Sequence, residues 1–189
     1  MLKKISILFT AFGLTMLLGA CSSDNTAKTE PDISAQSTTV AETGTGENIL
    51  DPSAVSFALY DIDGNLRESS EWVGKQPLVV NFWGTWCPPC RKEIPELVRL
   101  YDEYKDQGIE MVGLAMNDKA EKVKSFAEAN NMNWIMLLGD RTVAGDYGGI
   151  TGVPTTIFID RNGKELGRFI GPRSYEVFKE AFEALLQPA

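Results

Sequence analysis

The chain is organised around residues 77–95, which read PLVVNFWGTWCPPCRKEIP. This stretch opens with an apolar run of branched and aromatic residues, Leu78 to Trp83, which indicates a buried strand. Beyond Cys90, apolar side chains recur at helical spacing, at Ile94, Leu97, Val98, Tyr101 and Tyr104. The sequence therefore predicts a strand that leads directly into a helix, with Cys87 at the junction.

Cys87 and Cys90 form a Cys-x-x-Cys pair spaced by about one helical turn. The start of a helix carries unpaired N–H groups and partial positive charge, which favour a thiolate over a thiol. The residues between the cysteines let the two sulfurs meet as a disulfide or separate as a dithiol. We expect Cys87 to be the exposed nucleophile and the deeper Cys90 to resolve a mixed disulfide.

Two simpler interpretations of this pair are a structural zinc site and a structural disulfide. Zinc in a structural site usually takes four Cys or His ligands, whereas the chain has three cysteines and no histidine. A purely structural disulfide around so short a loop would add little loop-closure stabilisation. We therefore expect a redox-active Cys87–Cys90 disulfide, with no metal and no organic cofactor.

Two segments carry a resemblance to a known family. Residues 81–95 closely resemble the active-site segment of thioredoxin-like proteins of the TlpA/ResA type, and residues 152–156, GVPTT, resemble their cis-proline loop. The resemblance spans roughly residues 53–187. It implies a thioredoxin-like three-layer α/β sandwich with an N-terminal β-hairpin extension, and a thiol-disulfide oxidoreductase activity.

The resemblance also implies which residues meet the substrate. Val153 and Pro154 would be joined by a cis peptide, and the Val153 backbone would pair with an extended substrate by strand addition. Trp86 and Pro88 would contact the substrate beside the cysteines. Ordinary packing is the alternative role for Trp86.

Asn81 and Glu93 mark a departure from cytoplasmic thioredoxins, which carry a buried aspartate at the strand position of Asn81. An asparagine cannot exchange protons near neutral pH. Glu93, three residues beyond Cys90, matches the acid of ResA-like proteins and would supply proton transfer instead. The alternative is a solvated glutamate beside Arg91 and Lys92.

Residues 1–20 have the pattern of an export signal. A positive start at Lys3 and Lys4 precedes an apolar segment that ends at Cys21. The residues LGAC at positions 18–21 resemble a bacterial lipobox, which predicts a lipoprotein signal peptide and lipidation of Cys21. An ordinary secretory signal and an uncleaved anchor are the alternatives. Export favours a disulfide-permissive compartment.

The remaining chain divides into a linker and one domain. Residues 21–52 are rich in Ser, Thr, Asp, Glu, Ala and Gly, so we expect the lipidated Cys21 to be followed by a disordered linker. Residues 53–189 would form the thioredoxin-like domain. The formal net charge of −8 argues against nucleic-acid binding.

Elsewhere the pattern alternates strands and helices, as expected for an α/β sandwich. A strand at residues 55–59 and a turn at 61–65 would form the hairpin. Asp118 and Glu121 resemble a capping box that opens a helix at 119–130, and Asp140 would cap a short helix. Further strands are predicted at 109–116, 134–138, 155–160 and 165–170, and a last helix at 174–186.

These observations predict a monomeric, membrane-tethered, extracytoplasmic enzyme that reduces protein disulfides. The resemblance implies apocytochrome c or another exported redox protein as substrate, and a membrane protein as electron donor. A disulfide-donating oxidase, a peroxiredoxin-like peroxidase and a non-catalytic binding module are the alternatives. A peroxidase would need Thr or Ser three residues before its cysteine, where this chain has Gly84.

Overall fold

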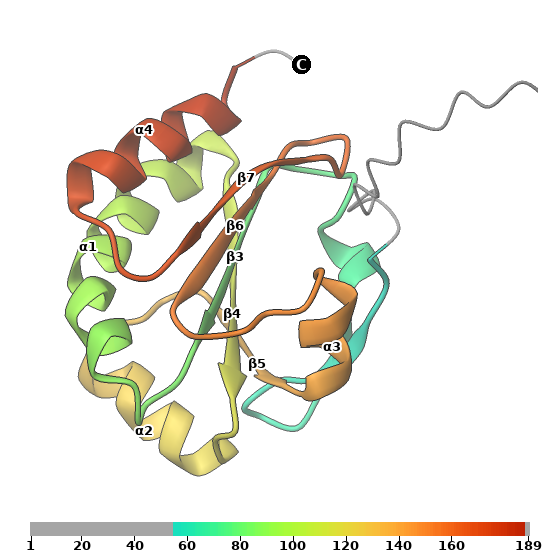
Figure 1. The fold of residues 1–189 in the computed structure, drawn as a ribbon, viewed down its shortest axis with the longest axis vertical. Coiled ribbons are helices and arrows are strands. Elements are labelled where there is room, and N and C mark those ends of the chain that lie inside the picture. Colours follow the sequence, from blue (N-terminus) through green and yellow to red (C-terminus); the bar gives the residue numbers. More distant parts are fainter. Residues whose placement is uncertain (1–54, 188–189) are drawn as a thin grey trace, which may run out of the picture. The chain divides into compact units, whose positions relative to one another are not determined.

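The computed structural model describes residues 55–187 (Figure 1). The predicted signal peptide at 1–20, Cys21 and the linker to residue 52 lie outside the described residues, so these features stay predictions. Within the described part of the chain, no helix combines the length and the apolar character that crossing a membrane requires.

A five-stranded mixed sheet forms the centre of the domain. Three neighbouring strands of this sheet run parallel to one another, the fourth pairs antiparallel with the third, and the fifth pairs antiparallel with the fourth. Across the sheet the strands follow the order β5 (Ile135–Gly139), β4 (Glu110–Met116), β3 (Leu78–Trp83), β6 (Thr155–Ile159) and β7 (Glu165–Ile170). The strand that leads into the cysteine pair, β3, is therefore central.

Helices cover both faces of this sheet (Figure 1). One face packs against three helices, α1 (Pro88–Tyr104), α2 (Ala120–Ala129) and α4 (Tyr175–Leu185). The other face packs against α3 (Arg141–Asp146) and the N-terminal hairpin. This arrangement confirms the predicted three-layer α/β sandwich.

The alternation of side chains along β3 explains the two faces. Every residue of β3 is buried, which matches a sequence that is apolar except for Asn81. Val79 and Trp83 belong to the core under α1, whereas Val80 and Phe82 belong to the core under α3. Asn81 has the same parity as Val79 and Trp83, so it faces α1.

The N-terminal hairpin is present but shorter than expected. Its strands are β1 (Ala58–Tyr60) and β2 (Leu66–Glu68), followed by the 3₁₀ turn η2 (Ser69–Glu71). The first strand begins at residue 58, not at 55 as predicted, although Val55 is buried. The turn is held by Asp61, whose Oδ1 accepts hydrogen bonds from backbone N–H groups at 2.9 Å.

The predicted capping box at Asp118 and Glu121 is wrong. Helix α2 begins at Ala120 with Lys119 as its N-cap, and no side chain caps it. The Asp118 carboxylate instead binds Thr85, which precedes the cysteine pair. The carboxylate binds Thr85 and not the helix end, because Thr85 offers both a backbone N–H and a hydroxyl.

Other local predictions are confirmed. Asp140 caps α3 by accepting a hydrogen bond from Val143 N at 2.8 Å. Strands β6 and β7 form the hairpin expected around residues 161–164, where Asp160 Oδ1 accepts from two backbone N–H groups at 2.9 Å. The short 3₁₀ turn η3 (Lys105–Gln107) follows α1.

Candidate active site

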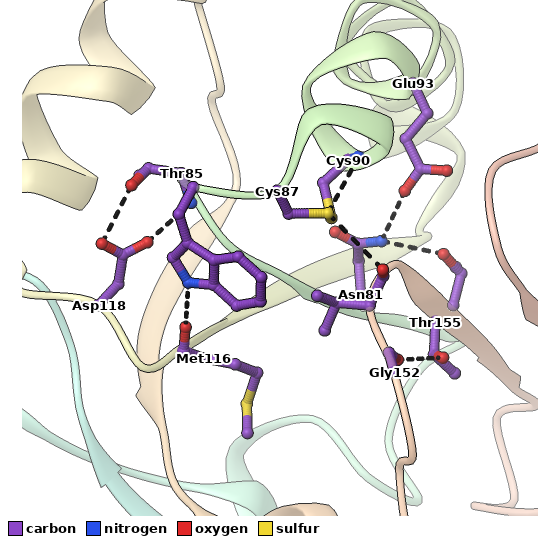
Figure 2. The surroundings of a disulfide bond; sticks show 12 residues. Asn81, Thr85, Cys87, Cys90, Glu93, Met116, Asp118, Gly152 and Thr155 are labelled. Carbon is purple, nitrogen blue, oxygen red and sulfur yellow. Dashed lines mark hydrogen bonds between the residues drawn. A yellow bond between two sulfur atoms is a disulfide. The ribbon is translucent and has the colours of Figure 1, made fainter.

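The cysteine pair lies where β3 meets α1, joined as a disulfide in this structure (Figure 2). The Cys87 N–H donates to Gly84 O at 3.1 Å, which closes a turn between the strand and the helix. Cys87 is the N-cap of α1 and Cys90 stands in its first turn. The predicted strand–cysteine–helix arrangement is therefore formed.

The first turn of α1 offers Cys87 little hydrogen bonding. Pro88 and Pro89 occupy the first two helical positions and have no N–H to donate. The first available donor is Cys90, whose backbone N–H donates to Cys87 Sγ at 3.2 Å. The sulfur of Cys87 thus receives one backbone donor at a helix end that usually provides several.

Neither sulfur-bearing side chain is exposed in the disulfide form. Cys87 is 2% exposed and Cys90 is 1% exposed, so the expectation that Cys87 is exposed is wrong for this state. The carbonyl oxygen of Val153 lies 3.6 Å from Cys87 Sγ, and the Val153 side chain packs against the same core. Contact with the cis-proline loop therefore covers Cys87.

The cis-proline loop has the form that the resemblance implied. The peptide between Val153 and Pro154 is cis, and Pro154 is buried while Val153 is partly exposed. Thr155 Oγ1 donates to Gly152 O at 2.9 Å, and Pro154 O accepts from Gly171 N at 2.8 Å. Within residues 55–187, no backbone hydrogen bond uses the Val153 N–H.

Glu93 is buried, so its alternative interpretation as a solvated residue is wrong. It is 2% exposed, and its Oε1 accepts a hydrogen bond from Asn81 Nδ2 at 3.3 Å. Burial raises the pKa of Glu93 to about 7, and the Asn81 amide and the neighbouring Arg173 oppose this shift only in part. The site thus contains a carboxyl group that titrates near neutral pH.

Asn81 connects Glu93 to the sheet. Its Nδ2 also donates to Thr156 Oγ1 at 2.9 Å, so one amide group bridges helix α1 and strand β6. Figure 2 shows the Asn81 side chain between the disulfide and the Glu93 carboxylate. No local pattern indicates the role of Thr156, because its hydroxyl meets Asn81 only through the pairing of β3 with β6.

Trp86 both packs and remains accessible. Its indole Nε1 donates to Met116 O at 2.9 Å, yet 49% of the residue is exposed. Pro88 beside it is exposed as well. A groove of about 190 Å³ adjoins the indole, and its lining residues are Trp86, Met116, Asn117, Ile150, Thr151, Gly152 and Val153.

The site also contains a contact that the sequence did not reveal. The Asp118 carboxylate accepts hydrogen bonds from Thr85 N at 2.7 Å and from Thr85 Oγ1 at 3.0 Å (Figure 2). These two residues stand more than thirty positions apart, which hides the pair from any local pattern. Among the predicted site residues, Cys87, Cys90 and Val153 meet at the disulfide, Trp86 and Pro88 flank Cys87 in the chain, and Glu93 lies one turn beyond Cys90 on α1.

Comparison with known proteins places this geometry in a family. The family model described as AhpC/TSA family matches residues 51–164. The chain is 34% identical over 135 residues to the thiol-disulfide oxidoreductase ResA of Halalkalibacterium halodurans, which covers 71% of this chain and 76% of that protein. It is 33% identical over 135 residues to the ResA of Bacillus cereus, with 71% and 75% covered.

Solved structures agree with the fold. A thiol:disulfide interchange protein of the thioredoxin family from Chlorobium tepidum superimposes with a TM-score of 0.64 at 33% identity, covering 70% of this chain and 94% of that one. Together with the disulfide between strand and helix, these likenesses confirm the predicted thioredoxin-like class. The chain belongs to the AhpC/TSA family and is a thioredoxin-like thiol-disulfide oxidoreductase.

Proposed function

We propose that this oxidoreductase is tethered to a membrane outside the cytoplasm and reduces disulfides in other exported proteins. The observation that carries the proposal is the position of Cys87. It caps α1 directly after Trp86 and lies 3.6 Å from the carbonyl of Val153, and both of these neighbours line an accessible groove, whereas Cys90 stands within the first turn of the helix. A substrate disulfide that approaches along the groove meets Cys87 first.

The reaction proceeds by two thiol–disulfide exchanges. The Cys87 thiolate attacks one sulfur of the substrate disulfide, the substrate S–S bond breaks, and the other substrate sulfur leaves as a thiolate that takes up a proton. The Cys90 thiolate then attacks Cys87 Sγ and releases the second substrate thiol. Two electrons pass to the substrate, and the enzyme is left with its Cys87–Cys90 disulfide.

Glu93 serves the second exchange by accepting the proton of Cys90. It stands one turn further along α1 from Cys90, is shielded from water, and has a pKa near the working pH. Its Oε2 has no hydrogen-bond partner within the described residues, which leaves one oxygen able to take a proton. Asn81 holds the other oxygen.

Trp86, Pro88 and Val153 form the substrate contact surface in this proposal, and the buried Pro154 shapes the loop that presents Val153. The free N–H and the carbonyl of Val153 pair with an extended substrate segment, as in strand addition. Trp86 and Pro88 expose apolar surface beside the attacking sulfur. The enzyme acts as a monomer, with no metal or organic cofactor.

The tether and the electron supply rest on residues outside the described chain and on the reaction balance. Cys21 would carry the lipid, and the linker to residue 52 would let the domain reach its partners. Each turnover leaves the enzyme oxidised, so a membrane protein must return two electrons. Candidate substrates are the haem-site cysteines of apocytochrome c or an exported redox enzyme.

A peroxidase is the less suitable alternative for this site. Position 84 would need a hydroxyl side chain, but a Cβ on Gly84 would lie 2.7 Å from Trp86 Nε1. A side chain there would displace the indole. Turnover of peroxide without any protein disulfide would support the peroxidase instead.

Trapping tests the proposed function. The Cys90→Ala variant stops after the first exchange, so it should accumulate mixed disulfides between Cys87 and exported proteins in living cells. The matched control is Cys87→Ala, which lacks the attacking sulfur and should accumulate no mixed disulfides. Capture of no exported partner by Cys90→Ala, together with failure of the reduced wild type to reduce insulin, would refute a protein-disulfide reductase.

A further inference from the structure

The turn that delivers Cys87 is fastened to a second loop. Gly84 and Cys87 close this turn through their backbone hydrogen bond, so Thr85 and Trp86 are its central residues. Each of these two residues also makes a hydrogen bond outside the turn. Both acceptors lie at the end of β4, in the segment Met116–Asp118.

Asp118 makes the stronger part of this connection. Its carboxylate accepts from both the backbone N–H and the hydroxyl of Thr85, at 2.7 and 3.0 Å. The Asp118 side chain is only 2% exposed, and Lys122 Nζ lies 3.8 Å away. A buried carboxylate needs such partners, and hydrogen bonds to a charged acceptor are stronger than neutral ones.

The loop after β4 is shaped to present both acceptors. Trp86 Nε1 donates to Met116 O at 2.9 Å, one residue before Asn117, whose φ is 51°. A left-handed residue of this kind turns the chain sharply, and Asn tolerates it better than most residues. Three hydrogen bonds therefore join Thr85 and Trp86 to Met116 and Asp118.

Asp118 does not use its carboxylate for the helix that follows it. Helix α2 starts without any side-chain cap, although Asp118 stands just before its N-cap residue. A capping Asp stabilises a helix by accepting a hydrogen bond from one of its first N–H groups. The carboxylate is directed to the turn that carries the nucleophile instead.

We infer that Asp118 is a positioning residue, which acts through Thr85 to hold Cys87 in the geometry that favours its disulfide with Cys90. The inference depends on the Cys87–Cys90 couple, not on which protein the enzyme reduces. Holding two reacting groups in place raises the effective concentration of one group at the other, and this favours the bond between them. Loosening the turn should therefore weaken the disulfide relative to the dithiol.

The test is the redox equilibrium of the full chain with glutathione, which needs no protein substrate. Asp118→Ala should lower the equilibrium constant for disulfide formation about tenfold, which corresponds to about 30 mV for a two-electron couple. Thr85→Val should lower it to a smaller extent. In the Asp118→Ala background, Thr85→Val should have no further effect, since its partner is already gone.

Asp118→Asn separates geometry from charge. An asparagine can accept from Thr85 N and donate to Thr85 Oγ1, so it should retain nearly the wild-type equilibrium constant. If Asp118→Asn shifts the equilibrium as much as Asp118→Ala, the effect is electrostatic and the inference is overturned. Additive effects of Thr85→Val and Asp118→Ala would overturn it too.

Asp160→Ala provides the matched control. Asp160 also accepts two backbone hydrogen bonds, but at the β6–β7 turn, at the end of β6 opposite the cysteines. The Asp160→Ala substitution should lower the free energy of unfolding and leave the Cys87–Cys90 redox equilibrium unchanged. An equal shift in Asp160→Ala and Asp118→Ala would assign the effect to general destabilisation. If Asp118→Ala does not fold, Thr85→Val and Asp118→Asn still decide the question.

Discussion

Asn81 Nδ2 donates a hydrogen bond to Oε1 of Glu93 at 3.3 Å, and both residues are buried beneath the disulfide. This bond stabilises the ionised carboxylate, yet the cost of burying its charge is larger and raises the pKa of Glu93 to about 7. Glu93 is therefore protonated in the folded enzyme over a pH range where it is ionised in the unfolded chain.

Stability should depend on pH through Glu93. The pKa rises from 4.5 in the unfolded chain to about 7 in the folded one. The stabilising contribution of the proton is complete below the lower value and is lost as pH rises through the higher one. The wild type should lose on the order of 3 kcal/mol of unfolding free energy through Glu93 between acidic pH and about pH 8. Glu93→Gln has no such group to titrate, so its stability relative to the wild type should rise by that amount over the same range.

Urea unfolding of the oxidised proteins at several pH values measures this difference. Glu96→Gln, on the same helix but partly exposed, should follow the wild type at every pH. A Glu93→Gln difference that stays constant with pH would mean that Glu93 does not titrate in this range.

Glu93→Gln should also slow disulfide exchange. If Glu93 accepts the proton of Cys90, the variant should lose about a hundredfold in the rate of mixed-disulfide resolution. The inflection near neutral pH in the wild-type rate profile should disappear. Stopped-flow reduction of a model disulfide across pH tests this, and an unchanged profile would leave Glu93 with a structural role only.

In reduced protein, Cys87 should react with alkylating agents before Cys90. Cys87 follows the groove residue Trp86 and accepts the Cys90 N–H at 3.2 Å, whereas Cys90 stands within the first turn of α1. Peptide mass spectrometry after brief iodoacetamide treatment at neutral pH measures the order. Faster labelling of Cys90 would reverse the two roles.

Pro89→Ala should make the enzyme more oxidising. The substitution returns an N–H to the second helical position, where it can donate to the Cys87 thiolate. The pKa of Cys87 should fall and the reduction potential should rise, because the reduced form is stabilised. Pro95→Ala, later in the same helix, should change neither quantity. Equal shifts in both variants would contradict the donor argument.

Much of this fold could be predicted because its signals are local. The apolar run of β3, the Asp140 cap and the turn at 161–164 each depend on neighbouring residues, and all three are confirmed. The cis peptide before Pro154 could be predicted only from the family resemblance, because most peptide bonds before proline are trans.

The features that could not be predicted share one physical cause, which is contact between segments that are distant in the sequence. Asp118 fits a local capping pattern, but its carboxylate binds Thr85, which follows the neighbouring strand β3 at the same edge of the sheet. The exposure of Cys87 could not be judged without the loop of Val153, and the burial of Glu93 depends on the packing of α1 over β3, where Asn81 meets it. Packing of this kind leaves no periodic trace in the sequence.

The reduction potential of the Cys87–Cys90 couple tests the proposed direction of electron flow most directly. With Pro88 and Pro89 unable to donate, the thiolate is weakly stabilised and the disulfide is favoured. Equilibration with glutathione buffers should give a value nearer to about −270 mV, as in thioredoxin, than to about −120 mV. A potential near the oxidising end of that range would contradict the account and make this protein a disulfide donor.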